Sequence, residues 1–230
     1  MKISNKIIAV IPARSGSKSI IDKNIKRING KPLIAYSIEQ CLNSKLFKKI
    51  YISTDSKEYA RISKKYGPVE IILRPKNICK DNSTDYQMIK HLIKNVKEDY
   101  EFIAHIRPTS PLRKVNDLKL AIKQFINSNF SSLRSVHEMS ETSYKSVEIL
   151  KGQLKPLRNL NVDIDTINHP RQSFPKTFSP NGVIDIYRKQ VILKEKKLFG
   201  KKVRAFITSY SQEIDSLEDL KYLKYLWKKK

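Results

Sequence analysis

Apolar and polar residues follow two alternating rhythms through the first half of the chain. Short, continuously apolar runs such as Ile7–Ile11 have the composition of strands buried on both faces. Between them, segments such as Leu33–Leu42 carry apolar residues at the three- and four-residue intervals of an amphipathic helix. Alternating strands and helices predict βαβ units, and therefore an α/β fold with a mostly parallel sheet. The predicted strands are 7–11, 49–53, 69–73, 101–106 and 131–136, and the predicted helices are 33–42, 56–66, 85–96 and 116–126.

This rhythm stops at about Glu138. Residues 138–180 contain four prolines and no strongly periodic helical segment, which predicts an irregular or hairpin-containing insertion. Ser216 and Asp219 have the spacing of a capping box at the start of a closing helix. We expect one domain over residues 1–230, with 138–180 inserted into it. The later predicted strands are 182–188 and 203–208, and the closing helix is 216–227.

The end of the first strand carries the most informative loop. Ala13-Arg14-Ser15-Gly16-Ser17-Lys18 combines small residues with two cations, and Lys23-Asn24 follows closely. Small residues let backbone N–H groups approach a phosphate, while Arg and Lys supply counter-charge. Ligands of α/β proteins bind outside the carboxyl ends of parallel strands, so this loop predicts a nucleoside triphosphate as partner. The alternative is that these cations are ordinary solvated loop charges. The loop at Arg107 follows another strand and should lie on the same edge of the sheet.

The composition is strongly basic. Lys and Arg number 46 against 22 Asp and Glu, a formal net charge of +24. Such a charge raises the possibility of nucleic-acid binding, but the lysines are scattered along the chain, which favours a solvated basic surface instead. The two cysteines and four histidines show no disulfide-framework or metal-ligand spacing. The apolar run at Ile7–Ile11 is shorter than the roughly 7–15 residues of a signal-peptide core. No run reaches transmembrane length, so we expect a cytoplasmic protein without membrane insertion.

Common nucleotide and hydrolase motifs are absent. The chain has no GxxxxGK[ST], GxGxxG or GxSxG, which excludes a P-loop and leaves dinucleotide binding and an α/β-hydrolase unsupported. Five separated pieces remain, and in this order they resemble the CMP-sialic acid synthetase family, the cytidylyltransferases that activate nine-carbon acidic sugars. The pieces are Ala13–Lys18 with Lys23-Asn24; Leu73-Arg74-Pro75 with Asp81–Asp85; Arg107-Pro108-Thr109-Ser110-Pro111-Leu112-Arg113; Pro170-Arg171-Gln172 with Phe178–Gly182; and Glu213-Ile214-Asp215.

The resemblance implies a reaction and a set of roles. It implies a Rossmann-like nucleotidyltransferase core, a homodimer with a dimerisation lobe at 138–180, and CTP, Mg²⁺ and an acidic nine-carbon sugar as ligands. The anomeric hydroxyl of the sugar would attack the α-phosphorus of CTP and pyrophosphate would leave. The roles implied are catalysis by Arg14, Lys23 and Asp215; nucleotide binding by Arg14, Ser17, Lys18, Asn24, Arg74, Asp81 and Thr84; sugar binding by Arg107, Arg171 and Asn181; and metal binding by Asp215 and Glu213.

The two acids near the closing helix have two interpretations. Glu213 and Asp215 lie two positions apart, so in an extended segment both carboxylates share one face. Carboxylates combined with phosphate oxygens suit a hard cation. The alternative is that both simply place negative charge near the helix N-terminus.

The chain also departs from the family it resembles. The family's sialate enzymes usually carry Gln where this chain has Arg107 and Arg where it has Ser179, so one sugar-side cation is gained and another lost. We therefore hypothesise that Arg107 binds the sugar carboxylate or another polar group, with legionaminate- or pseudaminate-type acids as candidates. Two alternatives remain: a nucleotidyltransferase for another sugar, such as Kdo, and a nucleotide- or nucleic-acid-binding protein that keeps the fold without turnover.

Overall fold

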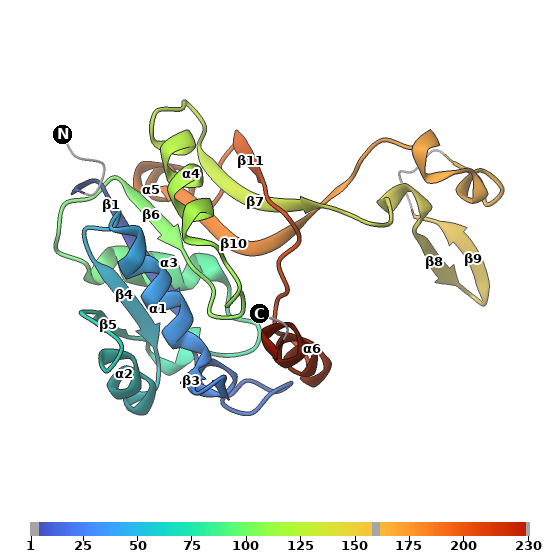
Figure 1. Ribbon diagram of the computed structural model, residues 1–230. Helices are drawn as coiled ribbons and strands as arrows, with labels where there is room; N and C mark the ends of the chain where they lie inside the picture. Colours follow the sequence, from blue (N-terminus) through green and yellow to red (C-terminus); the bar gives the residue numbers. More distant parts are fainter. Residues whose placement is uncertain (1–4, 158–161, 229–230) are drawn as a thin grey trace.

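A central β-sheet organises the protein. The computed structural model describes residues 5–157 and 162–228. Within them, seven strands pair in the order β11-β7-β10-β6-β1-β4-β5 (Figure 1). The sheet is mostly parallel, as predicted, and β10 runs antiparallel to both of its neighbours. The strands are β1 (Ile7–Pro12), β4 (Ile50–Thr54), β5 (Glu70–Leu73), β6 (Phe102–His105), β7 (Ser132–Glu138), β10 (Phe178–Arg188) and β11 (Val203–Ile207).

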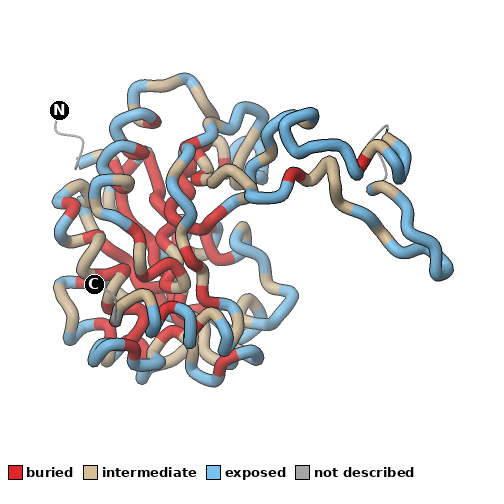
Figure 2. The backbone as a smooth tube through the Cα atoms, turned by 45° about the vertical axis from the view of Figure 1, so that its right-hand side comes forward, coloured by how far each residue is buried: buried red, intermediate tan, exposed pale blue. Residues whose placement is uncertain are grey.

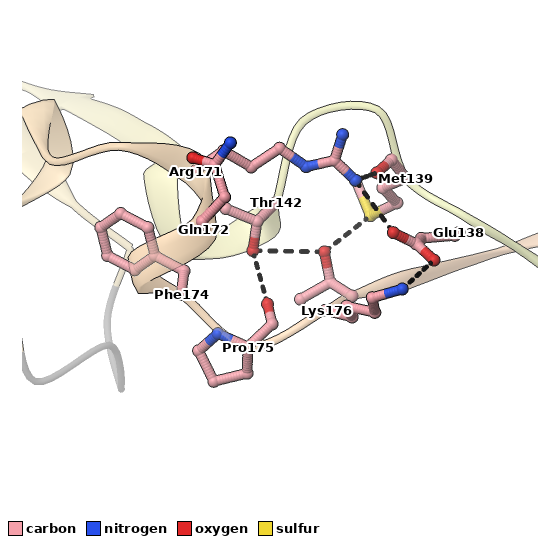
Figure 3. Close-up of a pocket in the computed structure, with 9 residues that line it drawn as sticks. Glu138, Met139, Thr142, Arg171, Gln172, Phe174, Pro175 and Lys176 are labelled. Atoms are coloured by element: carbon pink, nitrogen blue, oxygen red, sulfur yellow. Dashed lines mark hydrogen bonds and ion pairs between the residues drawn. The ribbon is translucent and has the colours of Figure 1, made fainter.

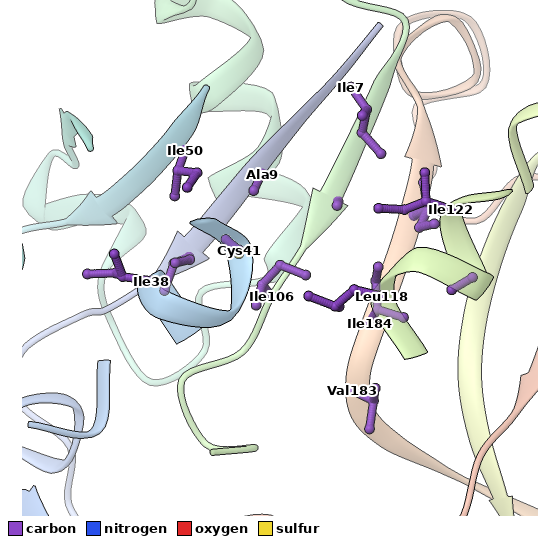
Figure 4. Packing of buried hydrophobic residues seen from close by; sticks show 14 of the residues in the cluster. Ile7, Ala9, Ile38, Cys41, Ile50, Ile106, Leu118, Ile122, Val183 and Ile184 are labelled. Atoms are coloured by element: carbon purple, nitrogen blue, oxygen red, sulfur yellow. The ribbon is translucent and has the colours of Figure 1, made fainter. Parts of the chain in front are cut away.

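Helices cover both faces of this sheet. Alternate residues of β1 point to opposite faces. Ile7 and Ala9 belong to the cluster with α1 and α4 (Figure 4), whereas Ile8 and Val10 belong to the cluster with α3 and α5. Burial on both faces explains why β1 reads as an unbroken apolar run. The helices of the body are α1 (Leu33–Ser44), α2 (Lys57–Lys64), α3 (Asp85–Asn95), α4 (Val115–Ile126) and α5 (Lys189–Glu195).

An arm projects from one side of the body. We define the arm as residues 139–177, of which 158–161 lie outside the described residues. Strands β7 and β10 pair out to Glu138 and Phe178, where the arm begins (Figure 1). It contains the predicted hairpin, here β8 (Val147–Leu150) and β9 (Gln153–Pro156). Most of its described residues are exposed (Figure 2). They include two with large apolar side chains, Ile149 and Leu154. The role of 138–180 in dimerisation stays a prediction.

The closing helix packs against the segment that follows the first strand. Helix α6 (Leu217–Lys228) buries Leu220 and Leu223 in a cluster with Ile20 and Ile28. Its predicted capping box is confirmed, because the Ser216 hydroxyl accepts from Asp219 N at 3.1 Å and the Asp219 carboxylate accepts from Ser216 N at 2.8 Å. This packing places α6 beside the segment that follows β1, at the carboxyl edge of the sheet.

Three local elements differ from the sequence prediction. Strand β10 begins at Phe178 rather than at 182, because its first residues pair with β7 beyond the body of the sheet. Helix α5 was not predicted: it has 7 residues, about two turns, with Ile192 as its buried residue. A small hairpin of β2 (Arg27–Ile28) and β3 (Lys31–Pro32) precedes α1, where only a helix start was expected.

Candidate functional site

A cavity of about 270 Å³ opens at the carboxyl ends of β1 and β6. The loops after these two strands meet there, as predicted, and the start of α3 and the segment before α6 complete its wall. The cavity is lined by Pro12, Arg14, Asn24, Arg74, Ser83, Thr84, Asp85, Met88, His105, Arg107, Pro108, Thr109 and Asp215. Six of the predicted site residues are therefore brought together: Arg14, Asn24, Arg74, Thr84, Arg107 and Asp215.

The loop after β1, residues 13–24, is held in shape by polar contacts; we call it the Arg14 loop. The Asp55 carboxylate, just beyond β4, accepts from Ser15 N at 2.7 Å and from the Ser15 hydroxyl at 2.9 Å. Asn24 Nδ2 donates to the carbonyl of Arg14 at 3.0 Å. Gly16 adopts a φ of 72°, which a glycine takes without strain. These contacts fix the backbone on which Arg14 is presented to the cavity.

Asp81 partly neutralises the cations of this loop. Its carboxylate pairs with Arg14 at 3.0 Å and with Lys18 at 2.6 Å. Hydrogen bonds from Lys18 and then Arg14 hold the pKa of Asp81 below its usual value. Ser17, Lys18 and Asp81 do not line the cavity, and Lys18 is linked through Asp81 to Arg14, which does.

Arg74 is a buried cation without a matching acid. Its side chain is packed at the cavity wall, where Nη2 donates to the carbonyl of Ser53 at 3.0 Å. Among the described residues, no carboxylate pairs with it, and its Nε has no hydrogen-bond partner. Burial lowers the pKa of Arg74, because the charged form is poorly solvated there. A buried positive charge with an unused donor favours binding of an anion.

Thr84 begins the helix that faces Arg74. Its hydroxyl accepts from Gln87 N, and Gln87 Oε1 accepts from Thr84 N, which forms a capping box at the start of α3. This arrangement explains why the sequence turns into a helix at this point.

The segment before α6 is anchored on both sides. Ile214 N donates to the carbonyl of Thr109 at 2.9 Å, and Lys23 Nζ donates to the carbonyl of Ile214 at 3.0 Å. Lys23 also pairs with Asp215 at 2.9 Å. Lys23 was predicted to take part in catalysis. It does not line the cavity itself, and its partner Asp215 has a largely exposed carboxylate there.

Glu213 occupies a different place from Asp215. Its carboxylate accepts from the Ser110 hydroxyl at 3.4 Å and is not part of the cavity wall. A Cβ atom on Gly182 would lie 1.8 Å from Glu213 Oε1, so this carboxylate rests on the glycine backbone. Burial raises the pKa of Glu213. No group of three or more acidic, His or Cys side chains suited to a metal occurs in the described ranges. Of the two predicted metal ligands, Asp215 lines the cavity and Glu213 does not.

Arg107 is bound by two carboxylates, a contact that the sequence did not reveal. Its Nη1 donates to Asp185 and its Nη2 to Asp85, each at 2.8 Å. We call these three residues the Arg107 cluster. The two carboxylates overcome the effect of burial and raise the pKa of Arg107. Asp185 was missed, although one signal existed: it is the only charged residue in the buried run Val183–Tyr187 of β10.

The backbone of Arg107 is fixed from behind by Arg113. This buried guanidinium donates to the carbonyl of Arg107 at 2.7 Å and to Gln40 Oε1 at 2.7 Å. It also donates to the carbonyl of Val183 on β10. Burial lowers the pKa of Arg113 to about 10. The sequence placed Arg113 in the same motif but assigned it no role, and the structure makes it the support of the Arg107 turn.

His105 is a packed histidine, as the apolar strand around it suggested. It is fully buried at the end of β6, and its Nδ1 lies 3.2 Å from the hydroxyl of Tyr187. Burial lowers the pKa of His105 to about 4, and the charge of Arg107 adds to this effect. His105 is therefore a neutral part of the cavity wall at pH 7.

Two predicted sugar-side residues lie away from this cavity. Arg171 belongs to the arm, where it pairs with Glu138 at 3.1 Å beside a separate hollow of about 380 Å³ (Figure 3). Asn181 is buried on β10 and donates to the Thr208 hydroxyl at 2.7 Å. Within one chain, the structure thus does not join either residue to Arg14 and Arg74.

Comparisons with known proteins show which proteins this chain is similar to. The family model described as cytidylyltransferase matches residues 8–227. The N-acylneuraminate cytidylyltransferase of Escherichia coli O18:K1:H7 is 34% identical over 91% of this chain, which spans 49% of that relative. The CMP-N,N'-diacetyllegionaminic acid synthase of Campylobacter jejuni is 32% identical over 96% of this chain and 94% of its own length. The chain thus spans about half of the first relative and nearly all of the second.

The fold likewise has solved counterparts. A CMP:2-keto-3-deoxy-manno-octonic acid synthetase complexed with CTP matches 97% of this chain and 99% of its own, with a TM-score of 0.73. At 17% identity this likeness shows the fold alone. In the part of the chain that the structure describes, no helix has the length and apolar character to cross a membrane.

Proposed function

The chain belongs to the cytidylyltransferase family, and on that premise we propose that it transfers CMP from CTP to the anomeric hydroxyl of a sialic-acid-like, nine-carbon ulosonic acid. Pyrophosphate is released. The observation that carries this proposal is the cavity at the ends of β1 and β6, where Arg14, Arg74 and Asp215 meet. The cations attract the triphosphate, and the carboxylate provides a metal ligand beside it.

Each cation around the triphosphate has a separate part in the proposal. Arg74 has no matching acid among the described residues, so it offers a net positive charge to an anion. Arg14 shares Asp81 with Lys18, so a phosphate that binds Arg14 competes with that carboxylate. Asn24 acts indirectly, through the Arg14 carbonyl that it holds. Thr84 contributes from the α3 N-terminus, where partial positive charge favours a negative ligand.

Asp215 is the residue that would hold Mg²⁺. Bound between Asp215 and phosphate oxygens, the ion would supply charge neutralisation for the departing pyrophosphate. Lys23 keeps the Asp215 carboxylate in place and adds a positive charge next to it. Glu213 acts at most through the backbone it supports, because its carboxylate is turned to Ser110 and Gly182.

The reaction itself is an in-line substitution at phosphorus. The acceptor's hydroxyl oxygen forms a bond to the α-phosphorus while the bond from that phosphorus to the pyrophosphate oxygen breaks, and the hydroxyl proton is released. The residues of the cavity contribute by holding both reactants and by stabilising negative charge on the leaving group. The loops that carry Arg14 and Arg107 lie on one edge of the sheet and line one cavity, which supports binding of nucleotide and acceptor next to each other.

The arm is proposed to join two copies of the chain in the cytoplasm. Its hairpin exposes Ile149 and Leu154, which a partner surface would cover. Arg171 does not reach the cavity of its own chain, so its proposed contact with the sugar requires the cavity of the second copy. Dimerisation and sugar binding by Arg171 are therefore one proposal, and mass measurement in solution tests its first part.

Pyrophosphate release with Mg²⁺ and each of the four nucleoside triphosphates tests the reaction. We expect CTP to be used with a nine-carbon ulosonic acid, and Kdo to be turned over more slowly. Arg74→Lys should raise the KM for CTP, because the ammonium loses the hydrogen-bonding geometry of the guanidinium. Lys76→Met, which removes a charge from the same segment outside the cavity, should leave that KM unchanged. Equal use of all four nucleotides, or equal effects of the two variants, would contradict the proposal.

A further inference from the structure

The Arg107 cluster is unusual in its charge balance. One guanidinium binds two carboxylates, each at 2.8 Å. Asp185 is 2% exposed and also lies 3.7 Å from Arg134, whereas Asp85 is 45% exposed at the cavity. The two positive charges, on Arg107 and Arg134, therefore compensate the two negative charges of Asp85 and Asp185. Arg107 is a charged side chain in a locally neutral setting, in contrast to the unmatched Arg74.

This balance determines which ligand groups suit Arg107. An acceptor carboxylate placed against it would stand beside two other carboxylates, and like charges at such distances repel strongly. Binding it would require Asp85 to leave its partner. An uncharged oxygen of a hydroxyl or an amide meets no such repulsion. A guanidinium has five N–H bonds, and the structure engages two of those of Arg107, so donors remain for such an oxygen.

We propose that Arg107 is a specificity-determining residue that binds an uncharged hydroxyl or acylamido oxygen of the acceptor and not its carboxylate. This inference rests on the proposed function. Asp185 is the matching positioning residue: it is too deeply buried to touch a substrate, but it fixes the guanidinium from behind. Asp85 fixes the guanidinium from the α3 side, so the donor geometry of Arg107 is set by both the sheet and the nucleotide-facing helix.

A panel of acids separates the two kinds of recognition. Nine-carbon ulosonic acids share the carboxylate but differ in their hydroxyl and acylamido substituents. Loss of a carboxylate contact would lower kcat/KM for every acid by the same factor. We expect Arg107→Gln instead to change the ratio of kcat/KM between the preferred acid and a differently substituted acid by at least about tenfold, the effect of one hydrogen bond to a charged group. The KM for CTP should change much less.

Three further variants make the test specific. Arg107→Lys keeps the charge without the planar set of donors, so it should shift the acid preference in the same direction as Arg107→Gln. Asp185→Asn should raise the KM for the acid with little change in kcat, because the guanidinium loses its fixed direction. Arg134→Gln is the control: it removes the other cation next to Asp185, and Arg134 does not line the cavity. This variant should leave the acid preference unchanged.

The outcomes distinguish this inference from the reaction on which it rests. If the unmodified protein turns over no acid, the proposed function fails. If it is active and Arg107→Gln lowers kcat/KM by the same factor for all acids, then Arg107 binds the carboxylate of the acid. That result would overturn the inference. An equally large shift of preference in Arg134→Gln would also overturn it, because the effect would then come from Asp185 and not from contact with Arg107.

Stability measurements provide a check on the cluster itself. Arg107→Gln leaves the buried Asp185 carboxylate without its closest cation, which should lower the melting temperature. Arg134, at 3.7 Å, is then the remaining cation next to Asp185. Adding Asp185→Asn removes this poorly compensated charge, so the double variant should melt above the single one. A double variant that melts no higher than Arg107→Gln would show that the pair is not coupled and would overturn the assignment of Asp185.

Discussion

The link between Asp55 and Ser15 should control CTP binding from outside the cavity. Asp55 accepts two hydrogen bonds from Ser15, at 2.7 and 2.9 Å, and thereby holds the Arg14 loop to the end of β4. Asp55→Ala removes both contacts. Hydrogen bonds to a charged group contribute about 1.5–3 kcal/mol each, and partial exposure of this site favours a combined loss near the low end, about 2 kcal/mol.

That free energy should appear in nucleotide affinity and not in global stability. The loop must be ordered when Arg14 holds the triphosphate, so the ordering cost is added to the binding step. A cost of about 2 kcal/mol corresponds to a roughly 30-fold weaker affinity for CTP. The melting temperature should change little, because Ser15 and Asp55 are only partly buried and the variant leaves the buried Ile20 of this loop packed against α6.

Titration calorimetry with CTP, together with thermal melting, tests this reasoning. Asp55→Asn retains one acceptor oxygen for Ser15 N and should lose less affinity than Asp55→Ala. Glu58→Ala, an exposed acid in the first turn of α2, is the matched control for the change in charge and should bind CTP normally. Unchanged CTP affinity in Asp55→Ala would refute the idea that this loop is positioned by Asp55.

Three other outcomes follow from the structure. Asp215→Ala should lower kcat by at least about a hundredfold and weaken the Mg²⁺ dependence in a metal titration, whereas Glu213→Gln should keep most activity; the reverse order would contradict the assignment of the metal ligand. Gly182→Ala should lower the melting temperature, because its φ is 61° and the new Cβ would lie 1.8 Å from Glu213 Oε1; an unchanged melting temperature would show that this segment shifts freely. The folded-state pKa of His105 is lowered from 6.5 to about 4, so its contribution to stability is present above pH 6.5 and is lost as the pH falls towards 4. His105→Gln should lose less stability over that pH range, and melting curves with the same pH dependence in both proteins would contradict the burial of a neutral imidazole.

Local patterns explain why much of the fold was predictable from the sequence. Strand β1 is buried on both faces and therefore reads as a continuous apolar run, and α3 carries its apolar residues on one face. The capping box at Ser216 and Asp219 depends on neighbouring residues alone, so it was visible before the structure. Helix α5 was missed because it is too short for its period to be evident among flanking lysines.

The contacts that define the site join residues far apart in the sequence. Arg107 follows β6 and Asp185 lies on β10, and the sequence did not show that these two antiparallel strands are adjacent. Our hypothesis from the sequence allowed Arg107 to bind the sugar carboxylate or another polar group, and its pairing with two carboxylates favours the second of these ligands. Asp55 was given no role from the sequence, because its bond to Ser15 depends on the β1–β4 pairing.

Transfer of phosphorus is the central claim, and labelled CTP tests it most directly. The protein is incubated with Mg²⁺, a nine-carbon ulosonic acid and CTP that carries a label on its α-phosphorus. The products are then separated, identified and quantified by mass spectrometry. The account predicts that the label moves to a CMP-sugar in the same amount as unlabelled pyrophosphate is formed. Label found only in CTP or in free CMP, with every acid of the panel, would contradict it.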